Sequence, residues 1–67
     1  MHISYNKLWK MLIDKNMNKR DLAEKSGVSS ASIAKLSKGA NITTNVLLKI
    51  CESMDCTLAD IMETIKD

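Results

Sequence analysis

Hydroxyl and basic side chains recur at helical spacing between residues 29 and 38. Ile33 and Leu36 are three residues apart, so both point to the core side of a helix with about 3.6 residues per turn. The opposite face is small and basic, and it carries Ser30, Ala31, Ser32 and Lys35. Hydroxyls and lysines can bond to base edges in the major groove of duplex DNA, and an alanine can contact a thymine methyl group. We therefore predict that these four residues contact bases.

A second helical segment and a turn signal precede this helix. Ala23 follows Leu22 on the earlier helix, where a small side chain lets two helices cross closely. Gly27 comes next, and glycine adopts the left-handed conformation that ends a helix without a side-chain penalty. Ser29 is then the expected N-cap of the following helix, with Val28 packed inward. The spacing predicts a DNA-binding helix-turn-helix over residues 19–38, and an ordinary pair of packed helices is the alternative.

A further set of residues is placed to contact the DNA backbone. Lys19 is in the first turn of the earlier helix, where free N–H groups attract phosphate. Arg20 either contacts the backbone beside it or pairs with Glu24 four residues later. The other predicted phosphate contacts surround the second helix, and they are Ser29, Lys38, Asn41, Thr43 and Thr44. Thr43 also suits an N-cap, so its role is either structural alone or shared.

The rest of the chain supplies helices that position this motif. Ser4 is the expected cap of a first helix that runs to about Lys15. Its apolar stripe, assigned to the core, is Tyr5, Leu8, Trp9, Leu12 and Ile13. Asn18 with Asp21 caps the next helix, and Thr57 with Asp60 caps a short last helix. Between them, a helix that runs to about Met54 is expected to bury Leu47, Ile50, Cys51 and Met54.

The predicted last helix carries four apolar residues, Leu58, Ile61, Met62 and Ile65. A chain of 67 residues buries only about 60% of its unfolded surface, so a partner is expected to cover some of them. We predict a homodimer whose interface includes Ile61, Met62 and Ile65. Two-fold symmetry would let it read two half-sites about 34 Å apart. The alternative is that these residues close the core of the monomer.

Composition and charge agree with a single folded domain over residues 1–67 that binds DNA. Hydrophobic residues make up 45% and charged residues 27%, which excludes a disordered tail. The net charge is only +2, but residues 1–40 carry a net +5 and residues 41–67 a net −3. The basic part contains the motif, as neutralisation of phosphates requires.

Other function classes lack support in the sequence. Cys51 and Cys56 are five residues apart, out of helical phase, and only His2 could join them, so we read both as reduced and expect no metal. No apolar stretch approaches the roughly 20 residues of a membrane span, and the expected location is the cytoplasm. No paired carboxylates flank a glycine-rich pocket, so we expect no enzyme, no cofactor and no small-molecule substrate.

With these residues in place, the chain resembles the Cro/CI-type (XRE) helix-turn-helix regulators of bacteria and phages over nearly its whole length. The resemblance rests on the spacing of the motif, on Lys38-Gly39 after it, and on the helix with Val46-Leu47-Leu48-Lys49-Ile50-Cys51. It implies a compact all-α domain of five helices, like that of lambda repressor, which binds operator DNA, usually as a dimer. In this family glutamine commonly holds phosphate at the position of Lys19.

The resemblance and the residues together imply a small repressor that binds a palindromic operator. One departure leaves a second reading open. Ser30 and Ala31 stand where many relatives carry long amide side chains that read adenine. Shorter residues would read bases less deeply, so Lys35 becomes the chief candidate for direct readout and DNA shape supplies the rest. The alternative is a protein interaction module, or an autoregulating antitoxin, that keeps the fold with little independent DNA reading.

Overall fold

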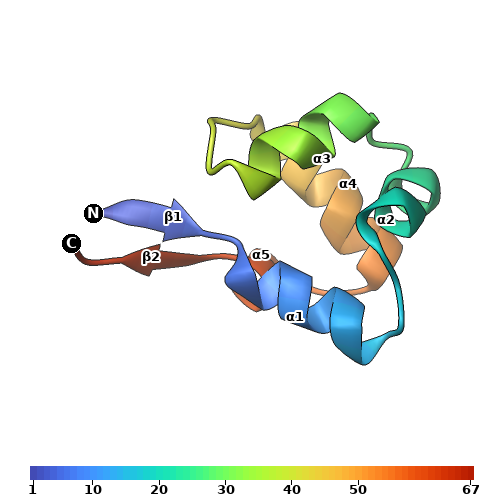
Figure 1. Cartoon of the computed structure of the whole chain (residues 1–67), viewed down its shortest axis with the longest axis horizontal. Coiled ribbons are helices and arrows are strands. Elements are labelled where there is room, and N and C mark those ends of the chain that lie inside the picture. The colour runs from blue at the N-terminus through green and yellow to red at the C-terminus, as the bar shows by residue number, and fades with distance from the viewer.

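The computed structural model describes residues 1–67 and contains five helices and one small sheet (Figure 1). The helices are α1 Asn6–Asp14, α2 Lys19–Ser26, α3 Ser30–Ser37, α4 Thr44–Met54 and α5 Leu58–Ile61. The strands β1 His2–Ser4 and β2 Glu63–Ile65 pair antiparallel, with Ile3 opposite Thr64. The predicted five-helix fold is confirmed, whereas the sheet that joins the two ends of the chain was not predicted.

One apolar core holds the helices together. α2 packs against both α3 and α4, and α5 packs against both α1 and α4. All five helices contribute to the twelve buried side chains, which are Tyr5, Leu8, Leu12, Leu22, Val28, Ile33, Leu36, Leu47, Ile50, Cys51, Met54 and Ile61. No helix is long and apolar enough to cross a membrane.

Local capping signals set the ends of the motif helices. The Asn18 side chain accepts a hydrogen bond from the Asp21 N–H at 2.8 Å, and Asp21 accepts one from the Asn18 N–H at 3.1 Å. Gly27 has φ +74°, and its N–H donates to the Ala23 carbonyl at 3.0 Å, which ends α2. Ser29 and Thr43 cap α3 and α4 by accepting from N–H groups three residues on. These predicted boundaries are confirmed.

The start of the chain differs from the prediction. Ser4 is in β1 rather than at the N-cap of α1, although its Oγ accepts a 3.3 Å hydrogen bond from the Asn6 N–H. Pairing with Glu63 holds Ser4 in an extended strand, so the helix begins at Asn6. Ile13 was assigned to the core and is 76% exposed. It is a quarter-turn away from the buried line of Leu8 and Leu12, and no helix covers it.

The end of the chain also differs. The segment predicted as one amphipathic helix is helical only to Ile61, because Met62 is extended (φ −142°, ψ +157°) and Ile65 is in β2. The Thr57 and Asp60 cap is confirmed, with Asp60 accepting from the Thr57 N–H at 2.9 Å. Ile61 has 0% exposure within the monomer, so its place in a dimer interface was wrong. For Ile61, closure of the monomer core was the correct alternative.

Cys51 and Cys56 lie next to each other, whereas their helical phase predicted that they would not share a face. Asp55 is left-handed (φ +53°), and the Cys56 N–H donates to the Cys51 carbonyl at 3.0 Å. This reversal folds the residue after the turn onto the last turn of α4. Burial, and next the neighbouring Cys51 thiol, raise the pKa of Cys56 to about 11.

Candidate nucleic-acid interface

The outer face of α3 presents short side chains and free ammonium groups. Ser30, Ala31 and Lys35 are exposed, as the sequence predicted, and neither Lys35 nor Lys38 forms an ion pair. Ser32 is half-buried, and its Oγ lies 3.1 Å from Oγ of the N-cap Ser29. The hydroxyls of Ser29 and Ser32 therefore already take part in the cap. Of the four predicted base contacts, this leaves Ser30, Ala31 and Lys35 free at the surface of the helix.

The first turn of α2 offers unpaired backbone donors. Asn18 and Asp21 satisfy each other's N–H groups, but the N–H groups of Lys19 and Arg20 donate to no group of the chain. Unpaired N–H groups at a helix start favour an anion, and two cationic side chains flank them here. Arg20 Nε is 3.6 Å from Glu24 Oε1, with both side chains largely exposed. A surface pair of this kind is weak, so Arg20 remains free to turn to a phosphate.

Trp9 has a role at this site that sequence reasoning missed. The Lys19 ammonium lies over the Trp9 ring, 4.8 Å from its centroid, and the ring is half-buried against the core. A cation is attracted to the negative face of an indole ring. Trp9 is on α1 and Lys19 is on α2, and the turn between the two helices brings them together. No local sequence signal identifies such a pair.

A groove of about 670 Å³ runs between α2 and α3. Its apolar lining is Ala23, Ile33 and Ala34. Its polar lining combines predicted phosphate contacts with a predicted base contact, and it consists of Lys19, Arg20, Glu24, Ser30, Ser37 and Lys38. The fold thus gathers residues from both predicted sets around one depression. Small side chains at positions 23 and 34 keep this depression open.

The predicted contacts after α3 are placed elsewhere. Asn41 and Thr44 are exposed and line a second hollow, between the α3–α4 connection and β1. Thr43 Oγ1 accepts a 3.4 Å hydrogen bond from the Val46 N–H, which gives it the structural role that was one of its two readings. Asn41 lies in the connection that leaves the C-terminal end of α3, Thr43 is the N-cap of α4, and Thr44 is the first residue of α4. The candidate site therefore extends from the first turn of α2, along α3, to the start of α4.

Comparison with known proteins places this geometry in a family. A model of the Cro/C1-type helix-turn-helix DNA-binding domain matches residues 7–67. The crystal structure of the transcriptional regulator VanUg, Form II, is similar to this chain, with 48% sequence identity and a TM-score of 0.90 over 98% of this chain and 88% of that one. No curated protein matches. The chain belongs to the Cro/C1-type helix-turn-helix DNA-binding domains, the family that its motif spacing predicted.

Proposed function

We propose that this protein is a sequence-specific transcriptional regulator that inserts α3 into the major groove of operator DNA and represses by covering a promoter. The observation that carries the proposal is the outer face of α3, which is exposed, free of ion pairs, and small enough to enter a groove. The similarity to VanUg, which is named a transcriptional regulator, supports the same role.

The residues divide into base readers and backbone contacts. Ser30 and Ala31 sit in the first turn of α3, where recognition helices of this motif approach base edges. Lys35 is one turn further on and long enough to reach a guanine edge. Lys19, at the start of α2, and Lys38, at the C-cap of α3, both line the groove and are suited to phosphates. Two copies would read the two halves of a palindromic operator.

Selection of bound sites from random duplex DNA at two salt concentrations tests the proposal. We expect an enriched inverted repeat with half-sites about one helical turn, or 34 Å, apart, whose binding weakens as salt rises. Lys35→Ala should relax the preference at one base position of each half-site. Lys49→Ala is the matched control, because Lys49 is an exposed lysine on α4 that lines neither the groove nor the second hollow.

Failure of the selection has a definite meaning. If no sequence is enriched even at low salt, the chain acts as a protein interaction module, and the short side chains of Ser30 and Ala31 are the reason. Equal site preferences of Lys35→Ala and wild type would remove Lys35 from base reading.

A promoter reporter carrying the selected site tests the sign of regulation. Repression requires that expression of the protein lower reporter output when the site overlaps the promoter. The same site with its two half-site cores exchanged for unselected sequence is the control. Increased output in the intact reporter would make the protein an activator.

A further inference from the structure

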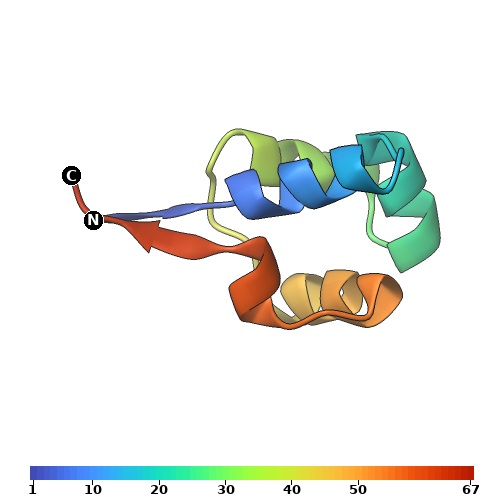
Figure 2. The same cartoon turned by 90° about the horizontal axis from the view of Figure 1, so that it is seen from below.

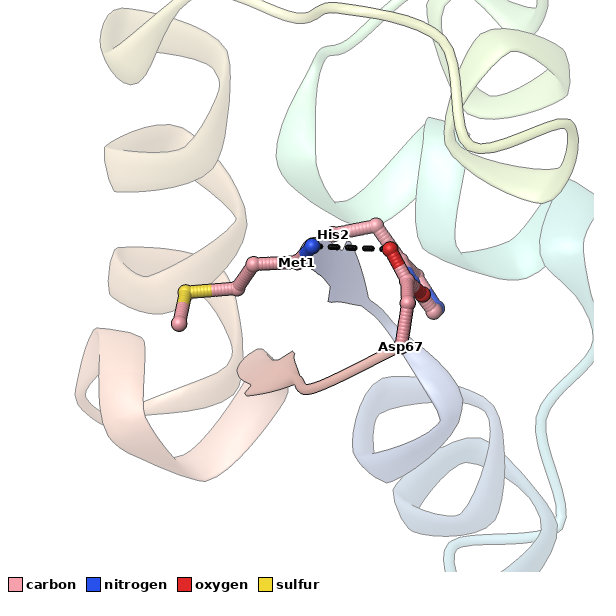
Figure 3. A network of polar contacts seen from close by, with 3 residues as sticks. All are labelled: Met1, His2 and Asp67. Atoms are coloured by element: carbon pink, nitrogen blue, oxygen red, sulfur yellow. Dashed lines mark hydrogen bonds and ion pairs between the residues drawn. The ribbon is translucent and has the colours of Figure 1, made fainter.

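The two ends of the chain form an arm, defined here as residues 1–4 and 63–67, which extends from one end of the helical body (Figures 1 and 2). Polar contacts close it, since the Met1 amino group and His2 Nδ1 each lie 2.7 Å from a carboxylate oxygen of Asp67 (Figure 3). Each strand has only three residues. A two-stranded sheet of this size is marginally stable in water without further packing.

The arm has free edges beside apolar surface. The sheet has two strands, so each strand leaves its outer backbone groups without a strand partner. Met1 is 79% exposed and Ile3 is 43% exposed. A hollow of about 460 Å³ separates these residues from the α3–α4 connection, and Ile42, Leu47 and Met62 also line it. The free edge and the hollow together form a surface that another strand could cover.

Charge selects which strand pairs. β1 carries no acidic or strongly basic residue, and His2 is its one titratable side chain. β2 begins with Glu63, and Lys66 and Asp67 follow it. Two copies that met antiparallel through β2, around Thr64, would place polar Thr64 at the centre and put Glu63 of each copy diagonally next to Glu63 of the other, which is unfavourable. Two copies that met through β1 would place apolar Ile3 at the centre of the contact.

We propose that β1 pairs antiparallel with β1 of a second copy, around a two-fold axis near Ile3, so that the two arms form one four-stranded sheet. An antiparallel edge pair is self-complementary, as a two-fold dimer requires. Ile3 of each copy then lies beside Ile3 of the other. This inference rests on the homodimer of the proposed function and assigns it a surface, which differs from the predicted face of an amphipathic last helix.

The position of the arm suits DNA reading. It leaves the helical body at the end where α3 stops and the α3–α4 connection begins (Figure 1), and the hollow touches both arm and connection. A two-fold axis through the arms would therefore place the two α3 helices on either side of it. The molecule with its arm is 32 Å long, so the helical bodies of two copies joined this way are spaced on the scale of one DNA turn, about 34 Å.

Sedimentation over a concentration series tests the pairing. We expect wild type to dimerise reversibly, and Ile3→Lys and Ile3→Glu each to weaken dimerisation by about tenfold or more, because each places like charges opposite one another. An equimolar mixture of the two variants should recover the dimer, since opposite charges then face each other. Ile13→Lys makes the same change at an exposed isoleucine on α1 and should leave dimerisation unchanged.

Ile3→Cys provides a second readout in case a charge unfolds the arm. Treatment with the thiol oxidant diamide should link this variant into a dimer, whereas wild type and Ile13→Cys, which contain the same native thiols, should stay unlinked. A wild type that is monomeric at every concentration and on two-half-site DNA would overturn the inference. So would an Ile3→Lys protein that dimerises like wild type, or a mixture that recovers no dimer.

DNA binding separates this inference from the proposed function. Ile3→Lys should bind a single half-site as wild type does and should lose the tighter binding to two half-sites. A wild type that dimerises through β1 but selects no DNA sequence would keep the arm pairing and overturn the regulator.

Discussion

Replacement of Lys19 by alanine tests the assignment of phosphate contacts. Lys19 is the first residue of α2, where two backbone N–H groups have no partner in the chain, and its ammonium lies over the Trp9 ring. If that ammonium neutralises a phosphate, its removal should weaken binding to every DNA sequence alike. The loss should shrink as salt rises, because fewer counterions are released when the variant binds.

The size of the effect follows from the number of contacts. One phosphate contact contributes about 0.9 to the slope of log affinity against log salt, so two Lys19 residues in a dimer contribute about 1.8. Over a fourfold rise in salt, the affinity gap between wild type and Lys19→Ala should therefore narrow by about twelvefold. Base preferences should not change. Lys49→Ala, on α4, should leave both slope and affinity as they are.

Substitutions of Trp9 separate charge from position. A cation over a partly exposed ring gains about 0.5–1 kcal/mol, which is about two- to fivefold in an equilibrium. Trp9→Leu keeps an apolar side chain but removes the ring, so it should lower affinity by that factor and leave the salt slope unchanged. Trp9→Phe should recover part of the loss.

Fluorescence anisotropy with a labelled operator, titrated at several salt concentrations, measures both quantities. An unchanged slope in Lys19→Ala would refute the phosphate contact. Tighter DNA binding by Trp9→Leu would show that the ring holds the ammonium away from DNA rather than toward it. Thermal unfolding of each variant checks that the fold is intact.

Three further predictions concern stability and reactivity. Asp55→Gly should stabilise the fold by about 0.5–1 kcal/mol in urea unfolding, because Asp55 is left-handed (φ +53°) and places a negative charge at the C-terminus of α4. Asp55→Asn removes only the charge, so it separates the effect of the charge from that of the backbone conformation. Hydrogen bonds from the Thr57 N–H and hydroxyl hold the pKa of Asp60 below its ordinary 3.8. The ionised carboxylate therefore stabilises the folded protein above pH 3.8, and this contribution is lost as pH falls through the lowered pKa. Circular dichroism in acid should show a shallower pH dependence for Asp60→Ala, and an unchanged one would contradict the cap. Burial raises the pKa of the Cys56 thiol from 9.0 to about 11. Cys56 should therefore react with a thiol reagent at pH 8 about a hundredfold more slowly in the folded than in the unfolded protein. Equal rates in the two states would refute its burial.

The helix-turn-helix could be predicted because its signals act over a few residues. The Asn18 cap finds its partner three residues away, and Gly27 bonds back to Ala23 within one helical turn. The burial of Ile33 and Leu36 follows from helical periodicity alone. Each of these features depends on local backbone geometry, so a single sequence is enough to locate them.

The arm could not be predicted in this way. β1 and β2 are three residues each, and they pair across almost the whole length of the chain. A strand this short shows too little alternation to distinguish it from a helix end. Periodicity at Ile61, Met62 and Ile65 favoured continuation of a helix, whereas pairing with β1 extends the chain after Ile61. The contact between Trp9 and Lys19 could not be predicted from the sequence for the same reason, since it depends on how two helices pack.

The short side chains of α3 give the arm added importance for specificity. Ser30 and Ala31 cannot reach far into a groove, so under the proposed function each copy would discriminate bases mainly through Lys35 and the shape of the DNA. Discrimination energies of two separate half-sites add, so a preference of about 100-fold per half-site becomes about 10,000-fold for a rigidly joined pair. Under the proposed function, a regulator with such a short-chained reading surface would depend on dimerisation more than one with long amide readers does. If the arm is what joins the two copies, residues 1–4 and 63–67 set the specificity of the protein without touching a base.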